Sequence, residues 1–200
     1  MFNYLIRVQL PDRPGALGAV ASRIGSVGGD VVSIDILQRD NGIVVDELGV
    51  GLAQDDLIDL LREEILEVDG VSIESIRPVE GAMPDRTAEL LDITAELLTQ
   101  TSPTSLLEQL TGRVRRGLAA DFAVVVDGDG TTIVAGSGEP PAGVGLDAGG
   151  GAGPHVAVAP MAHAQRTLVV GRLDPVLRER ERQWVVTVAK LADYGRRDLT

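Results

Sequence analysis

The chain has 200 residues, of which 44% are hydrophobic and 2% aromatic, and it carries a net charge of −12. This length allows one or two domains, and the apolar fraction is sufficient for packed cores. The acidic balance argues against a nucleic-acid partner, because phosphates require a basic surface. The absence of cysteine excludes disulfides, thiolate catalysis and cysteine-ligated zinc. Neither an apolar run of about 18 residues nor a secretory signal is visible, so we expect a cytoplasmic protein with no membrane partner.

The first 80 residues carry a strand pattern followed by a helix pattern. Alternating apolar residues predict a strand over residues 4–10 that is largely buried on one face. A helical pattern then begins at Pro14, because a missing N–H costs nothing in the first turn of a helix. Gly28-Gly29 is expected to end this helix.

Two strands, a second helix and a last strand follow. Residues 31–38 and 43–52 read as strands, and Asn41-Gly42 between them is a strong hairpin signal. A second amphipathic helix over residues 57–66 is expected to be capped near Asp55, and a short strand over 71–76 comes after it. The predicted order is βαββαβ, which is typical of a ferredoxin-like unit.

One combination of short segments in this region is informative about family. Asp12-Arg13-Pro14-Gly15-Ala16-Leu17 lies between the first strand and the helix, and Val31-Val32-Ser33-Ile34-Asp35-Ile36 follows Gly28-Gly29-Asp30. In this order and spacing, the segments resemble the opening of an ACT domain, the amino-acid-binding regulatory module. The resemblance covers roughly residues 3–80.

The turn after the first strand is the best candidate for a binding site. A helix N-terminus presents free backbone N–H groups and a positive dipole end, which suit a small anion such as an amino-acid carboxylate. The ACT resemblance implies a ligand held by main-chain groups between two copies of the module, with Asp12 available for the ligand's ammonium group and the second strand supplied by the partner copy. The implied ligand-binding residues are Asp12, Arg13, Gly15, Ala16, Leu17, Ser33 and Ile34.

Two features leave the function of this turn open. Many ligand-binding ACT domains have an Asn near the position of Ser33, and a serine hydroxyl has a shorter reach than an amide. Pro14-Gly15 also suits a tight turn in a domain that only dimerises.

The hydrophobic periodicity breaks near residues 78–85, and a second domain follows. We place an ACT domain at 1–80, a linker at 81–87 and a second domain at 88–200. Helical patterns run from Arg86 and again from Pro103, with Ser102 as a plausible cap. Strand pairs are predicted at 122–126 with 132–135 and at 156–160 with 167–172, and a last helix at 175–194.

This helix–strands–helix order resembles a GAF domain, a small-molecule sensor module whose terminal helices often pair in dimers. The resemblance rests on pattern, over residues 88–195. It is abbreviated, because residues 136–154 are rich in glycine, proline and alanine where a GAF domain has more secondary structure. That composition buries little apolar surface, and we expect a mobile loop.

Other candidate sites have simpler explanations. His155 and His163 lack carboxylates at metal-ligand spacing, so we expect surface or hairpin-end histidines and no metal site. Asp127-Gly128-Asp129-Gly130 lacks the remaining ligands of a calcium loop, and a hairpin turn explains it. No serine lies in a nucleophile-elbow setting, and no combination of residues reads as catalytic.

The sequence therefore predicts an α+β protein with a ferredoxin-like ACT domain and a smaller, abbreviated GAF-like domain. The leading hypothesis is a non-enzymatic regulatory protein, without a cofactor, that binds an amino acid at the interface of an ACT homodimer. A regulated enzyme is a further candidate partner. The alternative is a ligand-free dimerisation module that docks on a partner enzyme. A hydrolase or transferase with an unrecognised site is disfavoured by the scarcity of histidine and the single lysine.

Overall fold

The computed structural model describes residues 1–141 and 155–195. The chain divides into two units, Met1–Pro84 and Asp85–Thr200, and each has its own sheet and helices. Among the described residues, no helix combines the length and the apolar character that crossing a bilayer requires.

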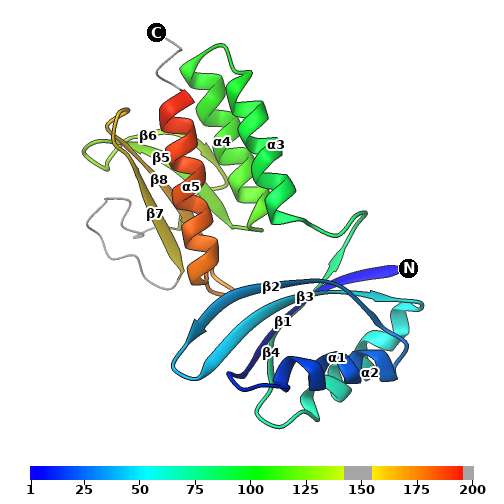
Figure 1. Ribbon diagram of the computed structural model, residues 1–200. Coiled ribbons are helices and arrows are strands. Elements are labelled where there is room, and N and C mark those ends of the chain that lie inside the picture. Colours follow the sequence, from blue (N-terminus) through cyan, green and yellow to red (C-terminus); the bar gives the residue numbers. More distant parts are fainter. Residues whose placement is uncertain (142–154, 196–200) are drawn as a thin grey trace. The chain divides into compact units, whose positions relative to one another are not determined.

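The first unit is built on an antiparallel four-stranded sheet (Figure 1). Its strands are β1 (Phe2–Pro11), β2 (Asp30–Asp40), β3 (Ile43–Leu52) and β4 (Ser72–Val79). The order across the sheet is β2-β3-β1-β4, so β2 and β4 are edge strands. With α1 (Ala16–Ser26) after β1 and α2 (Ile58–Leu66) after β3, this is the predicted ferredoxin-like βαββαβ arrangement.

The core of the first unit lies between the sheet and the two helices. Both helices cover the same face of the sheet (Figure 1). Val20 and Ile24 of α1 and Leu61 and Ile65 of α2 are buried there. They pack against the even-numbered residues of β1 and their partners on β3, because alternate residues of a strand point to the same face. The strand residues in this cluster include Tyr4, Ile6, Val8, Leu10, Leu48, Val50 and Leu52.

Most local signals in the first unit are confirmed. Asn41 and Gly42 have φ of 52° and 76°, as a two-residue hairpin turn with both central residues at positive φ requires. Asp40 and Ile43 are paired on either side of that turn. At the end of α1, the N–H groups of Gly28 and Gly29 donate to Gly25 O and Ile24 O, at 3.0 Å each, which satisfies carbonyls that the helix leaves free.

Two helix starts in the first unit differ from the prediction. Helix α1 begins at Ala16 instead of Pro14, because Gly15 has the left-handed conformation φ 89°, ψ −12° and interrupts helical geometry before Ala16. Asp55 does not cap the second helix. It lies in a short 3₁₀ turn, η1 (Asp55–Leu57), where no side-chain cap is formed, and its carboxylate accepts a hydrogen bond from the Tyr4 hydroxyl.

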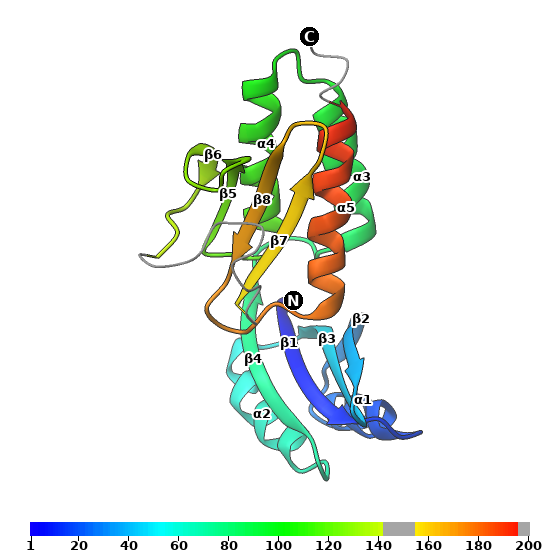
Figure 2. The ribbon, with the colours of Figure 1, turned by 90° about the vertical axis from the view of Figure 1, so that its left-hand side faces the viewer.

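The described residues of the second unit form another antiparallel four-stranded sheet and three helices. The strands are β5 (Phe122–Asp127), β6 (Ile133–Ser137), β7 (Val156–Met161) and β8 (Arg166–Gly171), in the order β6-β5-β8-β7. The helices are α3 (Arg86–Leu98), α4 (Pro103–Gly117) and α5 (Glu179–Gly195), and they lie on one face of this sheet (Figure 2). Leu106, Leu110, Val185 and Val188 belong to the core between the layers.

Side chains cap α3 and α4. Asp85 accepts hydrogen bonds from the N–H groups of Thr87 and Ala88, at 2.8 and 3.1 Å, and α3 therefore starts at Arg86. The predicted cap Ser102 accepts from the Ser105 N–H at 3.1 Å, with Pro103 in the first turn of α4.

The last helix begins later than the sequence pattern predicts, at Glu179 instead of Pro175. The residues before it are held in a non-helical path by Arg172. Its guanidinium Nε donates to Pro175 O at 2.6 Å, and its Nη2 donates to Val176 O at 3.2 Å. These carbonyls are thereby satisfied outside a helix.

The glycine-rich segment predicted as a loop is only partly described. Gly136 and Ser137 are not loop residues, since they belong to β6 and pair with Val124 and Ala123. Residues 142–154, which make up most of the segment, lie outside the described residues.

Candidate functional site

The turn between β1 and α1 is fixed by backbone hydrogen bonds. Asp12 N–H donates to Gly42 O, in the β2–β3 hairpin, at 2.8 Å, and Arg13 N–H donates to Pro11 O at 2.8 Å. Gly15 completes the turn with a positive φ that side-chain-bearing residues rarely adopt, and a Cβ built on it meets nothing within 4 Å. The turn therefore has a defined path and leaves space beside Gly15.

The start of α1 presents N–H groups that have no backbone acceptor among the residues the structure describes. Ala16 N–H donates to Arg13 O at 3.2 Å, and Ala19 N–H donates to Gly15 O at 2.9 Å. In the described part of the chain, the N–H groups of Gly15, Leu17 and Gly18 have no such backbone acceptor. The first turn of the helix contains no acidic residue and no side-chain cap. This end of the helix has the donors and the positive dipole that suit an anion.

Asp12 is engaged by an arginine of the second strand. Arg39 Nε lies 2.7 Å from Asp12 Oδ2, and Arg39 Nη2 lies 2.6 Å from Oδ1. The bidentate hydrogen bonds from Arg39 hold the pKa of the Asp12 carboxyl below its ordinary value. The Arg39 side chain is 68% exposed and that of Asp12 26%. A ligand ammonium group at Asp12 therefore has to share the carboxylate with Arg39.

Ser33 and Ile34 lie on β2, away from the turn of the same copy. Ser33 pairs with Gly49 and Ile34 with Leu48, so the two side chains point to opposite faces of the sheet. Arg39, which contacts Asp12, is six residues further along β2, roughly 20 Å at the rise of an extended strand. One copy of the chain does not bring Ser33 and Ile34 to the turn.

The outer strand β2 exposes a row of β-branched residues. Val32, Ile34 and Ile36 are each 47–49% exposed, whereas Ile6, Val8 and Leu10 of the inner strand β1 are buried. β2 is an edge strand and pairs with β3 on one side only within the described sheet. An exposed apolar edge of this kind is suited to pairing with another strand.

Two other groups behave as simple structural features. His163 lies in the β7–β8 turn, where its Nδ1 is 2.9 Å from Asp193 Oδ2, and no cluster of three metal-ligating side chains occurs in residues 1–141 and 155–195. Asp129 Oδ1 accepts hydrogen bonds from the Thr131 N–H and hydroxyl, at 2.8 and 2.7 Å. This pattern closes the predicted β5–β6 hairpin.

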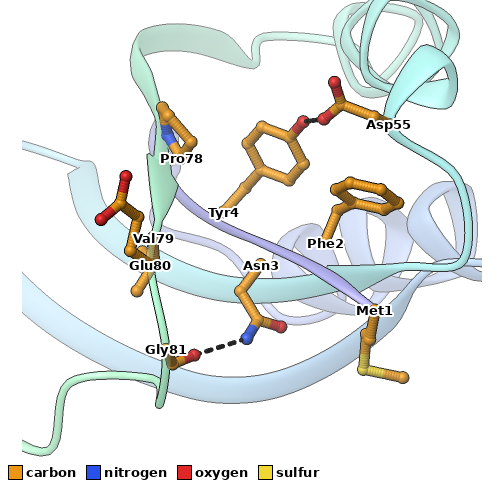
Figure 3. Close-up of a pocket in the computed structure, with 9 residues that line it drawn as sticks. All are labelled: Met1, Phe2, Asn3, Tyr4, Asp55, Pro78, Val79, Glu80 and Gly81. Atoms are coloured by element: carbon orange, nitrogen blue, oxygen red, sulfur yellow. Dashed lines mark hydrogen bonds between the residues drawn. The ribbon is translucent and has the colours of Figure 1, made fainter.

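A pocket that sequence reasoning missed lies at the opposite end of β1 from the turn (Figure 3). Its volume is about 360 Å³. The first residues of β1 and the end of β4 form its sides, and Asp55 adds a carboxylate next to Tyr4 (Figure 3). The Tyr4–Asp55 contact joins residues 51 positions apart, and no local pattern signals it. The lining residues are Met1, Phe2, Asn3, Tyr4, Asp55, Pro78, Val79, Glu80 and Gly81.

Comparisons with known proteins find similarity in solved structures alone. No protein-family model and no curated protein matches the chain. Solved ACT and GAF domains do resemble it. The ACT domain from GTP pyrophosphokinase of Chlorobium tepidum is 19% identical, with 39% of this chain and 97% of that one covered and a TM-score of 0.32. An ACT domain protein from Streptococcus pneumoniae is 19% identical, with 42% and 98% covered and a TM-score of 0.34.

A GAF domain is also among the similar structures. The GAF domain from Acinetobacter phosphoenolpyruvate-protein phosphotransferase is 15% identical, with 56% of this chain and 93% of that one covered and a TM-score of 0.43. The ACT matches cover the N-terminal 40% or so of the chain. Independently of these matches, the element order and the sheet order β2-β3-β1-β4 make the first unit ferredoxin-like.

Proposed function

We propose that this protein is a non-enzymatic regulator that binds an amino acid between the ACT-like units of two copies. The observation that carries the proposal is the group of N–H donors at Gly15, Leu17 and Gly18, which have no backbone acceptor within the described chain. They stand at the start of a helix that has no acidic residue in its first turn. Such donors favour a carboxylate, and a side chain that competes for them is missing from this turn.

In this proposal the two charged ends of the ligand meet different groups. The carboxylate accepts from the N–H groups around Gly15, and the ammonium group approaches Asp12, whose carboxylate is also bound by Arg39. Ser33 and Ile34 come from β2 of the second copy. The exposed apolar edge of β2 supports pairing of two copies at this strand.

The regulatory effect follows from linkage. A ligand that binds only to the paired arrangement stabilises that arrangement by its binding free energy. The second unit then reinforces the same pairing, or transmits the change in pairing to a regulated enzyme. No chemical step on the ligand is part of this proposal.

A thermal-shift screen against the common amino acids at millimolar concentration tests the proposal. A ligand present at about 100 times its dissociation constant adds about 2.7 kcal/mol to the free energy of unfolding, or roughly 5–10 °C for a chain of this size. We expect one amino acid, or a few related ones, to give this shift. Gly15→Leu is expected to abolish the shift, because the new side chain occupies the space beside the N–H donors.

Gly28→Leu is the matched control for this substitution. Gly28 lies at the other end of α1, has φ of 77° and also has open space at its Cβ position, so both substitutions carry a similar backbone strain. We expect both variants to lose stability, and only the Gly28 variant to keep the ligand-dependent shift. Loss of the shift in both variants, or in neither, contradicts the assignment of this turn.

The second candidate function is a ligand-free dimerisation module that docks on a partner enzyme. The exposed residues Val32, Ile34 and Ile36 on the edge strand favour it, because they suit pairing whether or not a ligand is present. Size measurement by light scattering separates the two candidates. A dimer that the amino acid strengthens supports the sensor, and a dimer that is indifferent to every amino acid supports the docking module.

A further inference from the structure

An aspartate of β3 lies in the core of the first unit. Val44, Asp46 and Leu48 occupy every second position of β3, so their side chains point to the same face of the sheet. Val44 and Leu48 belong to the core cluster, and so does Val8 of β1, which pairs directly with Asp46. Asp46 is accordingly only 2% exposed. Its carboxylate therefore lies among apolar side chains.

The Asp46 carboxylate has no polar partner among the residues that the structure describes. Its Oδ1 atom is shielded from solvent and makes no hydrogen bond, and the side chain forms no ion pair with any of these residues. Burial raises the pKa of the Asp46 carboxyl above its ordinary value of 3.8. A buried carboxylate without a partner is costly in its ionised form, and either protonation or hydration removes that cost.

The strands on either side of Asp46 supply no counter-charge. Its partner on β1 is Val8, and its partner on β2 is Ile36. Arg39, further along β2, is bound to the Asp12 carboxylate. The neighbouring charged residues of β1 and β3 point to the opposite face of the sheet and pair with each other there: Arg7 and Glu47.

The helices on the same face as Asp46 do not compensate its charge either. The buried residues of α1 and α2 are all apolar. The one charged residue of α1, Arg23, is bound to Glu64 of α2 at 2.8 Å. The remaining charged residues of α2 are exposed to solvent: Asp59, Arg62 and Glu63. A proton or water therefore has to compensate the charge of Asp46.

Water reaches Asp46 most easily from the side of β2. This edge strand shifts its register with β3 between Val31 and Ser33 and again between Ile36 and Gln38. Such shifts disrupt the ladder of hydrogen bonds locally. Ile36, the partner of Asp46, lies next to the second shift and is 49% exposed. On the other side of β3, the pairing with β1 has no shift.

We propose that Asp46 is a proton-controlled switch for local opening of the edge strand β2. With a proton, the carboxyl group stays in the core and β2 remains paired with β3. Without it, the charge favours openings of β2 that bring water to the carboxylate. A carboxyl with a raised folded-state pKa destabilises the closed state above that pKa, and the cost disappears as the pH falls towards 3.8. The switch requires neither an amino acid nor a second copy, so its test is independent of the proposed function.

Amide hydrogen exchange of the full chain, followed by ¹H–¹⁵N NMR, tests the switch. At pH 7 we expect the amides of β2 to be at least about tenfold less protected than those that join β1 to β4. Lowering the pH to about 4.5 is expected to raise the protection factors of β2 about tenfold, relative to β5 and β8 of the second unit. Equal protection of β2 and the β1–β4 pair, or protection of β2 that does not change with pH relative to this reference, overturns the proposal.

Asp46→Asn removes the charge at nearly constant size. We expect this variant to raise the protection factors of β2 at pH 7 about tenfold and to remove most of their pH dependence. Asp30→Asn is the matched control, because Asp30 is also on β2 but is exposed. Its effect on the same protection factors is expected to be less than about threefold. Equal effects of the two substitutions contradict the role of Asp46.

A second measurement needs no substitution and holds even if the Asp46 variant packs poorly. Titration of the side-chain carboxyl carbons by ¹³C NMR gives the pKa of Asp46 in the unaltered chain. We expect its midpoint to lie above 3.8, because burial disfavours the charged form. A midpoint at or below 3.8 shows that the carboxylate is compensated in the folded state and excludes the switch.

Discussion

Two arginine–carboxylate pairs, one in each unit, have similar contact distances and opposite surroundings. Arg39 Nη2 and Asp12 Oδ1 in the first unit are 2.6 Å apart, with side chains 68% and 26% exposed. Arg172 and Glu181 in the second unit are 2.9 Å apart, with side chains 3% and 0% exposed. In these two pairs the same chemistry lies at the surface in one case and in the interior in the other.

Further hydrogen bonds hold the buried pair in place within the fold. Arg172 Nη1 donates to Leu118 O at 2.6 Å, so the guanidinium links α4's end to the path that leads into α5. Glu181 Oε2 also accepts from the Arg178 N–H at 2.8 Å. The pair in the first unit is exposed to solvent, and solvent-exposed ion pairs contribute little net stability. The comparison indicates which carboxylate is available to a ligand: Asp12 and not Glu181.

The largest effect is expected from Glu181→Gln. This change keeps the size of the side chain but leaves the charge of Arg172 buried without its carboxylate, which costs about 3–5 kcal/mol of unfolding free energy. Urea unfolding measures the loss. Glu179→Gln removes a charge from the first turn of the same helix at an exposed position, and a change of no more than about 0.5 kcal/mol is expected. Equal losses in the two variants contradict the structural role of the buried pair.

An intermediate effect, dependent on pH, is expected at Asp193. Burial raises the pKa of this carboxyl. Hydrogen bonds from the His163 N–H and side chain and from the Ala164 N–H lower the pKa by more, so that it lies below its ordinary value of 3.8. A lowered pKa in the folded state means stability that is present above pH 3.8 and lost as the pH falls through the folded-state pKa.

Asp193→Asn tests this dependence. At pH 7 the variant is expected to lose about 1–3 kcal/mol, because an amide replaces an ionised acceptor of several hydrogen bonds. Thermal unfolding from pH 7 downwards is expected to show the gap between wild type and variant closing below pH 3.8. A gap of constant size across that range excludes the carboxylate charge as its cause.

The smallest effect on stability, with a separate effect on binding, is expected from Asp12→Asn. Its exposed pair with Arg39 leaves the melting temperature essentially unchanged. Calorimetric titration with the amino acid found by the screen is expected to show about tenfold weaker binding, because the ammonium group loses its carboxylate. Asp40→Asn removes a charge from the neighbouring hairpin and serves as the control. Unchanged affinity in the Asp12 variant excludes this residue from the ligand site.

Local features of the fold could be predicted from the sequence because they depend on neighbouring residues. Positive φ at Asn41 and Gly42, the Ser102 cap and the glycine end of α1 each involve residues within a few positions of one another. The alternating and helical hydrophobic patterns similarly predicted the order of elements in both units. The candidate turn at Asp12–Leu17 came from the same kind of local reading.

The tertiary structure decided the partners of side chains that are far apart in the chain. The position of Asp55 suits a helix cap, yet its carboxylate accepts a hydrogen bond from the hydroxyl of Tyr4, 51 residues away in the sequence. The helical pattern of α5 extends back to Pro175, yet Arg172 holds Pro175 and Val176 outside the helix.

A local pattern therefore determined where strands, turns and helices lie in this protein. It did not determine which polar groups meet, because a hydrogen bond between distant residues depends on sheet order and register, which are properties of the whole packed unit. Only the tertiary structure showed that Arg39 holds Asp12, that β2 is an exposed edge and that a pocket lies at the start of β1.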